Sequence, residues 1–397
     1  MRSPLAAHMD NIPFAGVRRA LERAVRMEET GARVIHFEIG RPDFDTPAHI
    51  REQAKRALDE GLTYYAPNRG LASLREAIAG MIAAKKGVSY DPGSEILVTA
   101  GGQEAIYLSV KGLLDPGDEV LVPNPGFGPF RSSVLLAGGV PVAVPPVSAD
   151  GLEMDLQAAE SLITERSRAI IINSPHNPTG NVATGEQLEQ IALLARKHDL
   201  FIISDEAYDH ILYNGIVHVS PASLPGMRDR TIMCGSLSKT YAMTGWRIGY
   251  VAAPAEFIQG VVRVQQNVML SVCSFAQAGA VAALTGSQDC VRAMVGEFDR
   301  RREAVVEALA HIPGLKVVGY PRGTFYVFVR HTACGMTSAR LGDYLLEEGK
   351  VAVVDGGAFG SAGEGCFRIS YATSYADCQE GMDRIGRAMR KLAAGQG

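Results

Sequence analysis

The sequence predicts an α/β fold with two parts. The large domain holds a mostly parallel sheet sandwiched by helices, and a smaller α+β domain is built from the C-terminal part and the N-terminal segment. Between residues 95 and 255, short β-rich runs alternate with amphipathic stretches of helix length, and several of these runs are apolar on both faces, as buried parallel strands are. From about residue 286 the pattern changes to a long charged helix followed by strand-like segments. The length of 397 residues also favours about two domains.

The N-terminal segment contains one amphipathic helix, predicted at 15–30, and one strand, predicted at 33–39. These two elements are too little for an independent core, so we expect them to pack on the C-terminal domain. The expected division is therefore an N-terminal segment 1–45, a large domain 46–285 and a small domain 286–397.

The elements of the two domains follow from hydrophobic periodicity and turn residues. In the large domain, strands are predicted at 95–100, 118–124, 140–146, 168–175, 200–206, 230–238 and 246–253, with helices such as 101–114 and 185–198 between them. In the small domain, a helix at 291–312 precedes strands at 314–320, 323–330, 351–356 and 366–372.

Composition excludes several classes of protein. The net charge is −4 and no basic block occurs, which argues against a nucleic-acid surface and favours small-molecule partners. Neither a disulfide framework nor a metal site is expected, because the six cysteines are scattered without a CxxC pair and no histidine cluster has ligand spacing. The first residues lack the apolar core of a signal peptide and no long uncharged apolar run occurs, so we expect a cytoplasmic protein with no membrane contact.

Ligands of α/β sheets bind beyond the carboxyl ends of the strands, so the residues after each strand are the candidate site. After the first strand, "AGGQEA" places Gly101 and Gly102 at a helix start, where free N–H groups can bind a phosphate. A plain tight turn explains the same glycines. After the fourth strand, "PHNPTG" presents the amide of Asn177, and a polar turn is again the alternative.

The next two strands end in charged residues. Asp205 in "SDEAY" is costly to bury without a cationic partner, although many such carboxylates only cap helices. In "SLSKTYAMTGWRIGY", Lys239 becomes a nucleophile if a desolvated pocket and the nearby Arg247 lower its pKa, and Ser236 and Ser238 can donate to the same phosphate as Arg247. Pyridoxal phosphate is the one cofactor that needs an amine, an acid, an amide and an anion site together.

On these motifs the chain resembles the class I/II aminotransferases of the fold-type-I pyridoxal-phosphate enzymes, over nearly its whole length from "IGRPDFDTP" to "FRISYA". The resemblance implies that Lys239 forms the internal aldimine and then moves the proton between Cα and C4′. It also implies that Asp205 pairs with the pyridine nitrogen and that Tyr208 and Asn177 contact the ring oxygen. The implied activity is a ping-pong exchange of an amino group between an L-amino acid and a 2-oxo acid.

The same resemblance implies the other ligand contacts. Phe127 in "PNPGFGPF" stacks on the ring, Arg368 in "CFRISYA" binds the substrate α-carboxylate, and Gly40 lines the same end of the site. A homodimer with shared active sites is implied because Tyr65 and Arg69 lie in a segment that reaches the neighbouring site. The implied phosphate ligands are Gly101, Gly102, Gln103, Ser236, Arg247 and, from the second copy, Tyr65.

Two segments depart from the family pattern. "VAVVDGGAFG" has Asp355 and Gly357 where relatives commonly carry proline and serine, and "NVMLSVCSFAQ" has Cys273 where small hydroxyl residues are usual. Both segments are expected near the substrate entrance. We therefore hypothesise that Asp355 disfavours acidic substrate side chains or favours polar or cationic ones.

Two alternatives differ in reaction or in class. A lyase or synthase on this fold, such as a carbon–sulfur lyase or a cyclopropane-forming synthase, shares the lysine, the acid and the arginine, although the order of "HNPTG", "AMTGWRIG" and "FRISYA" favours a transaminase. A regulatory module that senses an amino acid usually carries an N-terminal DNA-binding domain, and we expect no room for one before residue 30.

Overall fold

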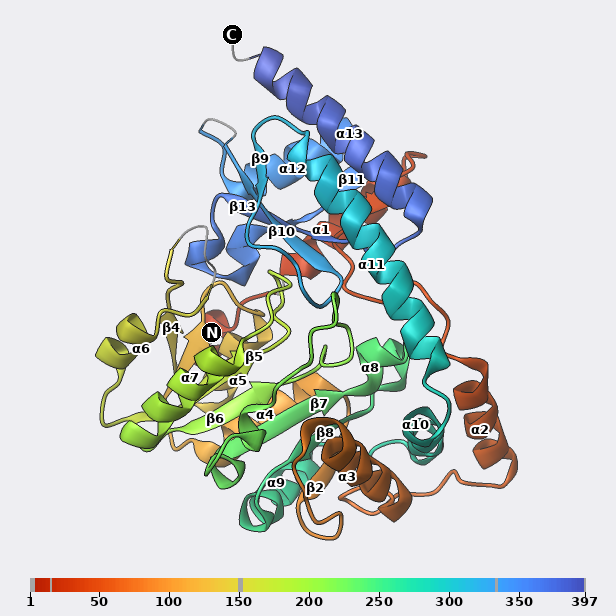
Figure 1. The fold of residues 1–397 in the computed structure, drawn as a ribbon, viewed down its shortest axis with the longest axis vertical. Helices are drawn as coiled ribbons and strands as arrows, with labels where there is room; N and C mark the ends of the chain where they lie inside the picture. The colour runs from red at the N-terminus through yellow and green to blue at the C-terminus, as the bar shows by residue number, and fades with distance from the viewer. Residues whose placement is uncertain (1–3, 15, 149–152, 333–334, 396–397) are drawn as a thin grey trace.

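The computed structural model describes residues 4–14, 16–148, 153–332 and 335–395. One of the six cysteines, Cys334, lies outside the described residues, and no disulfide joins the five described ones. Figure 1 shows two layered units: a wide sheet flanked by helices in the lower part of the view, and a smaller group of strands and helices above it.

The large sheet has seven strands in the order β2-β8-β7-β6-β5-β3-β4. Only β8 runs antiparallel to its neighbours, and the other pairs are parallel. This arrangement confirms the predicted mostly parallel sheet. The strands are β2 (Ile96–Thr99), β3 (Glu119–Pro123), β4 (Val140–Val144), β5 (Ser167–Asn173), β6 (Phe201–Asp205), β7 (Thr231–Ser236) and β8 (Gly249–Ala252).

Helices cover both faces of this sheet because its central strands are apolar on both sides. Ile170 and Ile202 pack on one face, whereas Ile171 and Ile203 pack on the other. One face carries α4 (Gly102–Leu113), α5 (Pro129–Ala137) and α9 (Ala255–Val268). The opposite face carries α3 (Ala72–Lys86), α6 (Leu156–Leu162), α7 (Gly185–Lys197) and α10 (Ser274–Thr285), and α2 (Ala48–Asp59) packs on α10. No helix of the described residues is long and apolar enough to span a membrane.

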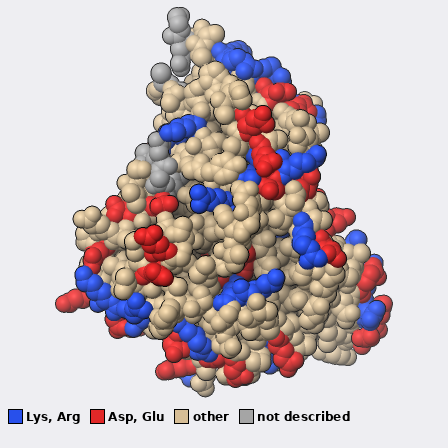
Figure 2. All heavy atoms as spheres, viewed as in Figure 1, with Lys and Arg blue, Asp and Glu red and all other residues tan. Residues whose placement is uncertain are grey.

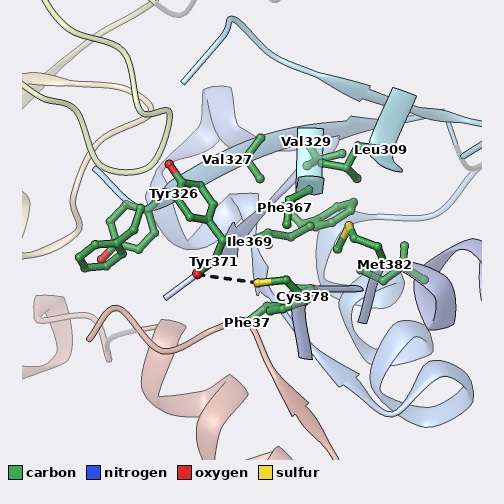
Figure 3. Close-up of a cluster of buried hydrophobic side chains, with 14 of the residues drawn as sticks. Phe37, Leu309, Tyr326, Val327, Val329, Phe367, Ile369, Tyr371, Cys378 and Met382 are labelled. Atoms are coloured by element: carbon green, nitrogen blue, oxygen red, sulfur yellow. Dashed lines mark hydrogen bonds between the residues drawn. The ribbon is translucent and has the colours of Figure 1, made fainter. Parts of the chain in front are cut away.

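The smaller unit is built on an antiparallel sheet in the order β12-β13-β10-β9. Figure 3 shows its apolar core, in which Phe37 from the N-terminal segment lies among side chains of the C-terminal elements. The strands are β9 (Leu315–Val317), β10 (Tyr326–His331), β12 (Val354–Asp355) and β13 (Cys366–Ser370), and the helices are α11 (Asp289–Ala310), α12 (Ser338–Gly349) and α13 (Tyr375–Ala394).

The N-terminal segment is attached to the smaller unit by backbone pairing. After the short 3-10 turn η1 (Ala7–Asn11) and helix α1 (Gly16–Glu28), strand β1 (Ile35–His36) pairs in parallel with β11 (Val351–Ala352). The N–H of Ser370 then donates to the carbonyl of Phe37 at 2.7 Å. The boundaries at residues 45 and 285 stay a prediction.

Most predicted strands are shorter in the structure, such as the one predicted at 33–39, which forms only at Ile35–His36, and in three of them the reason is local structure or pairing. The strand at 230–238 ends at Ser236, because the Ser236 hydroxyl accepts the N–H of Ser238 and starts the short helix α8 (Leu237–Thr240). The strand at 246–253 begins only at Gly249, after the 3-10 turn η4 (Thr244–Trp246). The segment 351–356 forms two strands, β11 and β12, because its two halves pair in different sheets.

Candidate active site

The candidate site lies at the carboxyl ends of three neighbouring parallel strands. Asn173 ends β5, Asp205 ends β6, and these two residues are in register with each other. Strand β7 is in register with β6 through Cys234 and leads directly into α8, which carries Lys239. Three segments that are far apart in the sequence therefore converge at one edge of the sheet, as the strand order predicts.

The amine of Lys239 is held by the N-terminal segment. Its Nζ donates to the carbonyl oxygen of Gly40 at 2.6 Å. A Cβ at Gly40 would lie 2.3 Å from the Tyr326 hydroxyl, so only glycine fits there. Burial, then the charge of Arg368 and then that of Arg247 together lower the pKa of Lys239 to about 8, against the raising effect of Asp205. Arg368 thus contributes more than Arg247, the cation that the sequence suggested.

Asp205 is a buried carboxyl without a basic partner from the chain. It is 7% exposed, and its Oδ1 accepts the N–H of Ala207 at 3.1 Å. No lysine or arginine among the described residues lies within 4.0 Å of it. Burial raises the pKa of Asp205 to about 7, against the lowering effect of the Ala207 N–H. A cationic group of a ligand would therefore find a counter-charge here.

Arg368 lies opposite these groups and is 2% exposed. Its Nη1 donates to Oδ1 of Asn177 at 3.1 Å, its Nη2 donates to the carbonyl of Glu38 at 2.6 Å, and its Nε has no partner. The guanidinium also lies 4.1 Å from the ring centroid of Tyr326. Since no carboxylate of the described residues pairs with it, this buried cation is suited to the carboxylate of a ligand.

Tyrosine hydroxyls connect the two ends of the site. The hydroxyl of Tyr208 lies 2.9 Å from that of Tyr326, and both side chains are buried. Burial raises the pKa of Tyr208 well above its ordinary value, so its hydroxyl stays protonated and can donate. Tyr326 was missed in the sequence because its partners lie far away in the chain, and no local signal identifies it.

Four of the predicted phosphate ligands come together on one chain: Gly101, Gly102, Ser236 and Arg247. Gly101 has a φ of +85°, and a Cβ there would lie 2.5 Å from Nη2 of Arg247. A Cβ at Gly102 would lie 3.2 Å from the Cβ of Ser236. The guanidinium of Arg247 donates to the carbonyls of Thr244 and Ala100. The start of α4, Ser236 and Arg247 therefore lie against one another, and the N–H groups of the helix start and the guanidinium are suited to an anion.

Other predicted residues occupy different surroundings. Gln103 is exposed in the first turn of α4, and Ser238 is buried with its N–H bound to the Ser236 hydroxyl. Phe127 is half-buried and packs edge to face on Phe130, with ring centroids 5.6 Å apart. Tyr65 is 85% exposed, so a single chain does not bring it into the site.

Of the two departures from the family pattern, Asp355 has a local structural role. The carboxylate of Asp355 accepts the N–H of Ala358 and so caps the 3-10 turn η5 (Gly356–Phe359). The ring of Phe359 in this turn lies 5.3 Å from the Arg368 guanidinium, which places the turn beside the site. Cys273 is exposed and precedes α10. The hypothesis that Asp355 selects substrates stays a prediction.

A mostly parallel sheet gathers a lysine, a buried carboxyl and a buried arginine at the ends of its strands, which is the arrangement of an α/β enzyme site that suits a ligand with charged groups of both signs. The model of the family described as aminotransferase class I and II matches residues 32–385. The chain belongs to this family, whose members generally depend on pyridoxal phosphate.

Named relatives cover nearly the full length of the chain. An aspartate aminotransferase of Pyrococcus abyssi is 43% identical over 98% of this chain and 98% of its own. An aromatic-amino-acid aminotransferase of Thermococcus litoralis is 43% identical over 90% and 92%. Among solved structures, the aspartate aminotransferase of Thermus thermophilus with maleate has a TM-score of 0.91 at 37% identity and covers 98% of this chain and all of that chain.

Replacing Arg368 by methionine is expected to lower kcat/KM for amino acid substrates by about 10²-fold or more, mainly through KM. The physical reason is that a charge-assisted pair with the substrate carboxylate is lost in a buried site. Steady-state kinetics with varied amino acid will measure this. Arg340→Met, on an exposed arginine of α12, is the matched control and should keep wild-type kinetics. An unchanged KM in Arg368→Met would contradict the assignment.

Proposed function

We propose that this chain is a pyridoxal-5′-phosphate-dependent aminotransferase that moves an amino group between an L-amino acid and a 2-oxo acid by a ping-pong mechanism. The observation that carries the proposal is the pairing of a buried carboxyl, Asp205, with an amine of lowered pKa, Lys239, at adjacent strand ends. Their chemistry suits a ligand that has both a cationic ring nitrogen and an aldehyde.

The residues of the site can hold this cofactor at each of its polar groups. Lys239 would bind it covalently through Nζ, Asp205 would pair with its ring nitrogen, and Tyr208 and Asn177 would contact its ring oxygen. The half-buried ring of Phe127 would stack on it. The phosphate would be bound by Gly101, Gly102, Gln103, Ser236, Ser238, Arg247 and Tyr65 of a second copy.

When bound, the cofactor supplies a carbonyl carbon for the substrate amine and a ring that takes up the electron pair of the breaking Cα–H bond. Asp205 keeps a proton on the ring nitrogen. The Lys239 amine, freed by the substrate, is the base that removes the Cα proton. Arg368 and Asn177 hold the substrate carboxylate at the Gly40 end of the site and so orient that proton toward Lys239.

The test is a half-reaction screen on the purified holoprotein. Each amino acid is added singly, and the visible absorption of the bound cofactor is followed. Aspartate and the aromatic amino acids come first, because the relatives are named for them. A transaminase loses the band and then forms a new amino acid when a second 2-oxo acid is added. Release of pyruvate and ammonia from one substrate instead would support the carbon–sulfur lyase alternative.

A homodimer with shared sites completes this proposal. Tyr65, Val268 and Leu270 are exposed apolar side chains, and hydrogen bonds join their two segments: Asn68 to Gln266, and Ser274 to the Leu62 carbonyl. A second copy that covers this surface would bring its own Tyr65 to the phosphate site.

Positive and negative side chains are interspersed over the face in Figure 2, which gives no support for a nucleic-acid partner. We place the protein in the cytoplasm.

Mixing two inactive variants tests the shared site. Lys239→Ala lacks the amine and Tyr65→Ala lacks the contact made to the other copy, so each homodimer has two defective sites. A mixed dimer regains one complete site, and a random mixture is expected to recover about a quarter of wild-type activity. Activity is measured after unfolding and refolding the two variants together. A mixture no more active than the Tyr65→Ala protein alone would contradict a shared site.

A further inference from the structure

Three carboxylates lie within five residues at the end of β6, and they differ in their basic partners. Asp205 has no basic partner among the described residues, whereas Glu206 and Asp209 both contact the amine of Lys86. Nζ of Lys86 lies 2.6 Å from Oε2 of Glu206 and 2.6 Å from Oδ2 of Asp209. Lys86 is the last residue of α3, and its side chain is only 2% exposed.

Glu206 is fully satisfied by this arrangement. Its Oε1 accepts the hydroxyls of Ser220 and Ser204 at 2.6 and 2.9 Å, and its Oε2 contacts Lys86 and, at 2.9 Å, Nε2 of His218. A fully buried carboxylate with four partners is a built charge site and not a helix cap. Removing one cation from such a site leaves a buried charge without compensation.

The charges of the cluster agree with this description. Burial alone would lower the pKa of Lys86, but Asp209 and Glu206 together raise it well above its ordinary value. Burial would likewise raise the pKa of Glu206, and Lys86 and His218 lower it to about 2 instead. Burial alone would also raise the pKa of Asp209, but His210, whose Nδ1 lies 2.7 Å from Oδ1 of Asp209, and then Lys86 hold that pKa well below its ordinary value. Both carboxylates are therefore ionised at neutral pH, and each of them disfavours the ionised form of Asp205.

We propose that Lys86 is a positioning residue for Asp205: its ammonium group neutralises Glu206 and Asp209 and thereby keeps the Asp205 carboxylate ionised toward the cofactor ring nitrogen. This inference rests on the proposed function. It assigns to Lys86, at the end of helix α3, the role of balancing the negative charges beside Asp205. The ionisable groups that face Asp205 from the surrounding elements are Glu206, Asp209, Lys239, Tyr208 and Cys234.

The sign of each substitution follows from Coulomb's law. Lys86→Met removes the positive charge, so nearby protons are held more tightly and Asp205 ionises less readily. Asp209→Asn removes one negative charge and acts in the opposite direction. The double variant Lys86→Met/Asp209→Asn removes one charge of each sign. Lys86→Arg keeps the charge, and Lys85→Met removes an exposed lysine from the neighbouring position as a matched control.

The experiment measures two properties of the bound cofactor that do not depend on turnover. Apoproteins are titrated with pyridoxal phosphate to obtain Kd, and the visible band of each holoprotein is then titrated with pH to obtain its midpoint. Circular dichroism establishes that each variant is folded. We expect Lys86→Met to raise Kd at least about tenfold and to move the midpoint upward. We expect Lys86→Arg and the double variant to stay within about threefold of wild-type Kd, and Lys85→Met to match wild type.

Asp209→Asn decides the matter if Lys86→Met does not fold, because it is expected to move the midpoint downward without raising Kd. The inference is overturned if folded Lys86→Met keeps the wild-type Kd and midpoint, or if Asp209→Asn leaves the midpoint unchanged. It is also overturned if the folded double variant binds as weakly as Lys86→Met, since Lys86 would then act through packing and not through charge. A wild-type apoprotein that takes up no pyridoxal phosphate overturns the proposed function itself.

Discussion

Lys239→Ala will lose transamination by at least about 10⁴-fold, because one amine both binds the cofactor and moves the Cα proton. Its Nζ is held at 2.6 Å from the Gly40 carbonyl. The rate is measured as new amino acid formed from a 2-oxo acid. In the wild-type holoprotein, borohydride reduction followed by peptide mass analysis should find the cofactor on the peptide that contains Lys239.

A surface lysine supplies the control for this result. Lys197 is exposed on α7 and pairs with Glu160, so Lys197→Ala should keep wild-type activity and the reduced adduct. Near-normal turnover by a correctly folded Lys239→Ala protein would remove the basis of the proposed mechanism. An adduct found on a different lysine would do the same.

Asp205→Asn is expected to lower kcat by about 10³-fold and to weaken cofactor binding. An amide has no negative charge, so it cannot keep a proton on the ring nitrogen, although its size and shape match the carboxyl. The measurement combines steady-state kinetics with a cofactor titration of the apoprotein. Asp199→Asn, at an exposed residue that pairs with Arg230, is the matched control. Equal rates for wild type and Asp205→Asn would contradict the role of the acid.

The same substitution is expected to stabilise the apoprotein at neutral and alkaline pH. Burial raises the pKa of Asp205 from 3.8 to about 7 in the folded chain. The folded chain therefore binds this proton more tightly than the unfolded chain, and stability that is present below pH 4 is lost as the pH rises toward 7. At pH 8 the apo form of Asp205→Asn should gain about 4 kcal/mol, whereas at pH 4 it should nearly match wild type. Urea unfolding of both apoproteins at the two pH values measures this difference.

The local sequence predicted the large domain well because hydrophobic periodicity and strand-end motifs are local properties. The alternating elements between residues 95 and 255 form the seven-stranded sheet, Asp205 ends β6, and Asn177 and Lys239 follow β5 and β7 within a few residues. The predicted strand bounds are wrong where pairing between segments far apart in the sequence decides which residues form a strand. Segment 351–356 is predicted as one strand, but its two halves belong to different sheets. Its first half, β11, pairs with β1, and its second half, β12, pairs with β13.

The roles of individual site residues were suggested by spacing and by resemblance, and these roles stay predictions. The sequence placed Lys239 next to Arg247, but it gave no sign that Arg368 would have the stronger effect on the pKa of the amine. It also gave no sign of Tyr326, whose hydroxyl meets that of Tyr208 across 118 positions of the chain. Contacts of this kind depend on how two units of the fold meet.

By itself, the sequence determined the fold class, the family and the strand ends at which chemistry is to be expected, since each of these follows from short-range patterns of side chains. Only the tertiary structure decided which of three neighbouring carboxylates has no basic partner. Lys86 compensates Glu206 and Asp209 from the end of another helix, 120 positions from Glu206, and leaves Asp205 to a ligand. The physical reason is that the ionisation of a buried group depends on distance and burial in space, which neighbouring letters in a sequence do not encode.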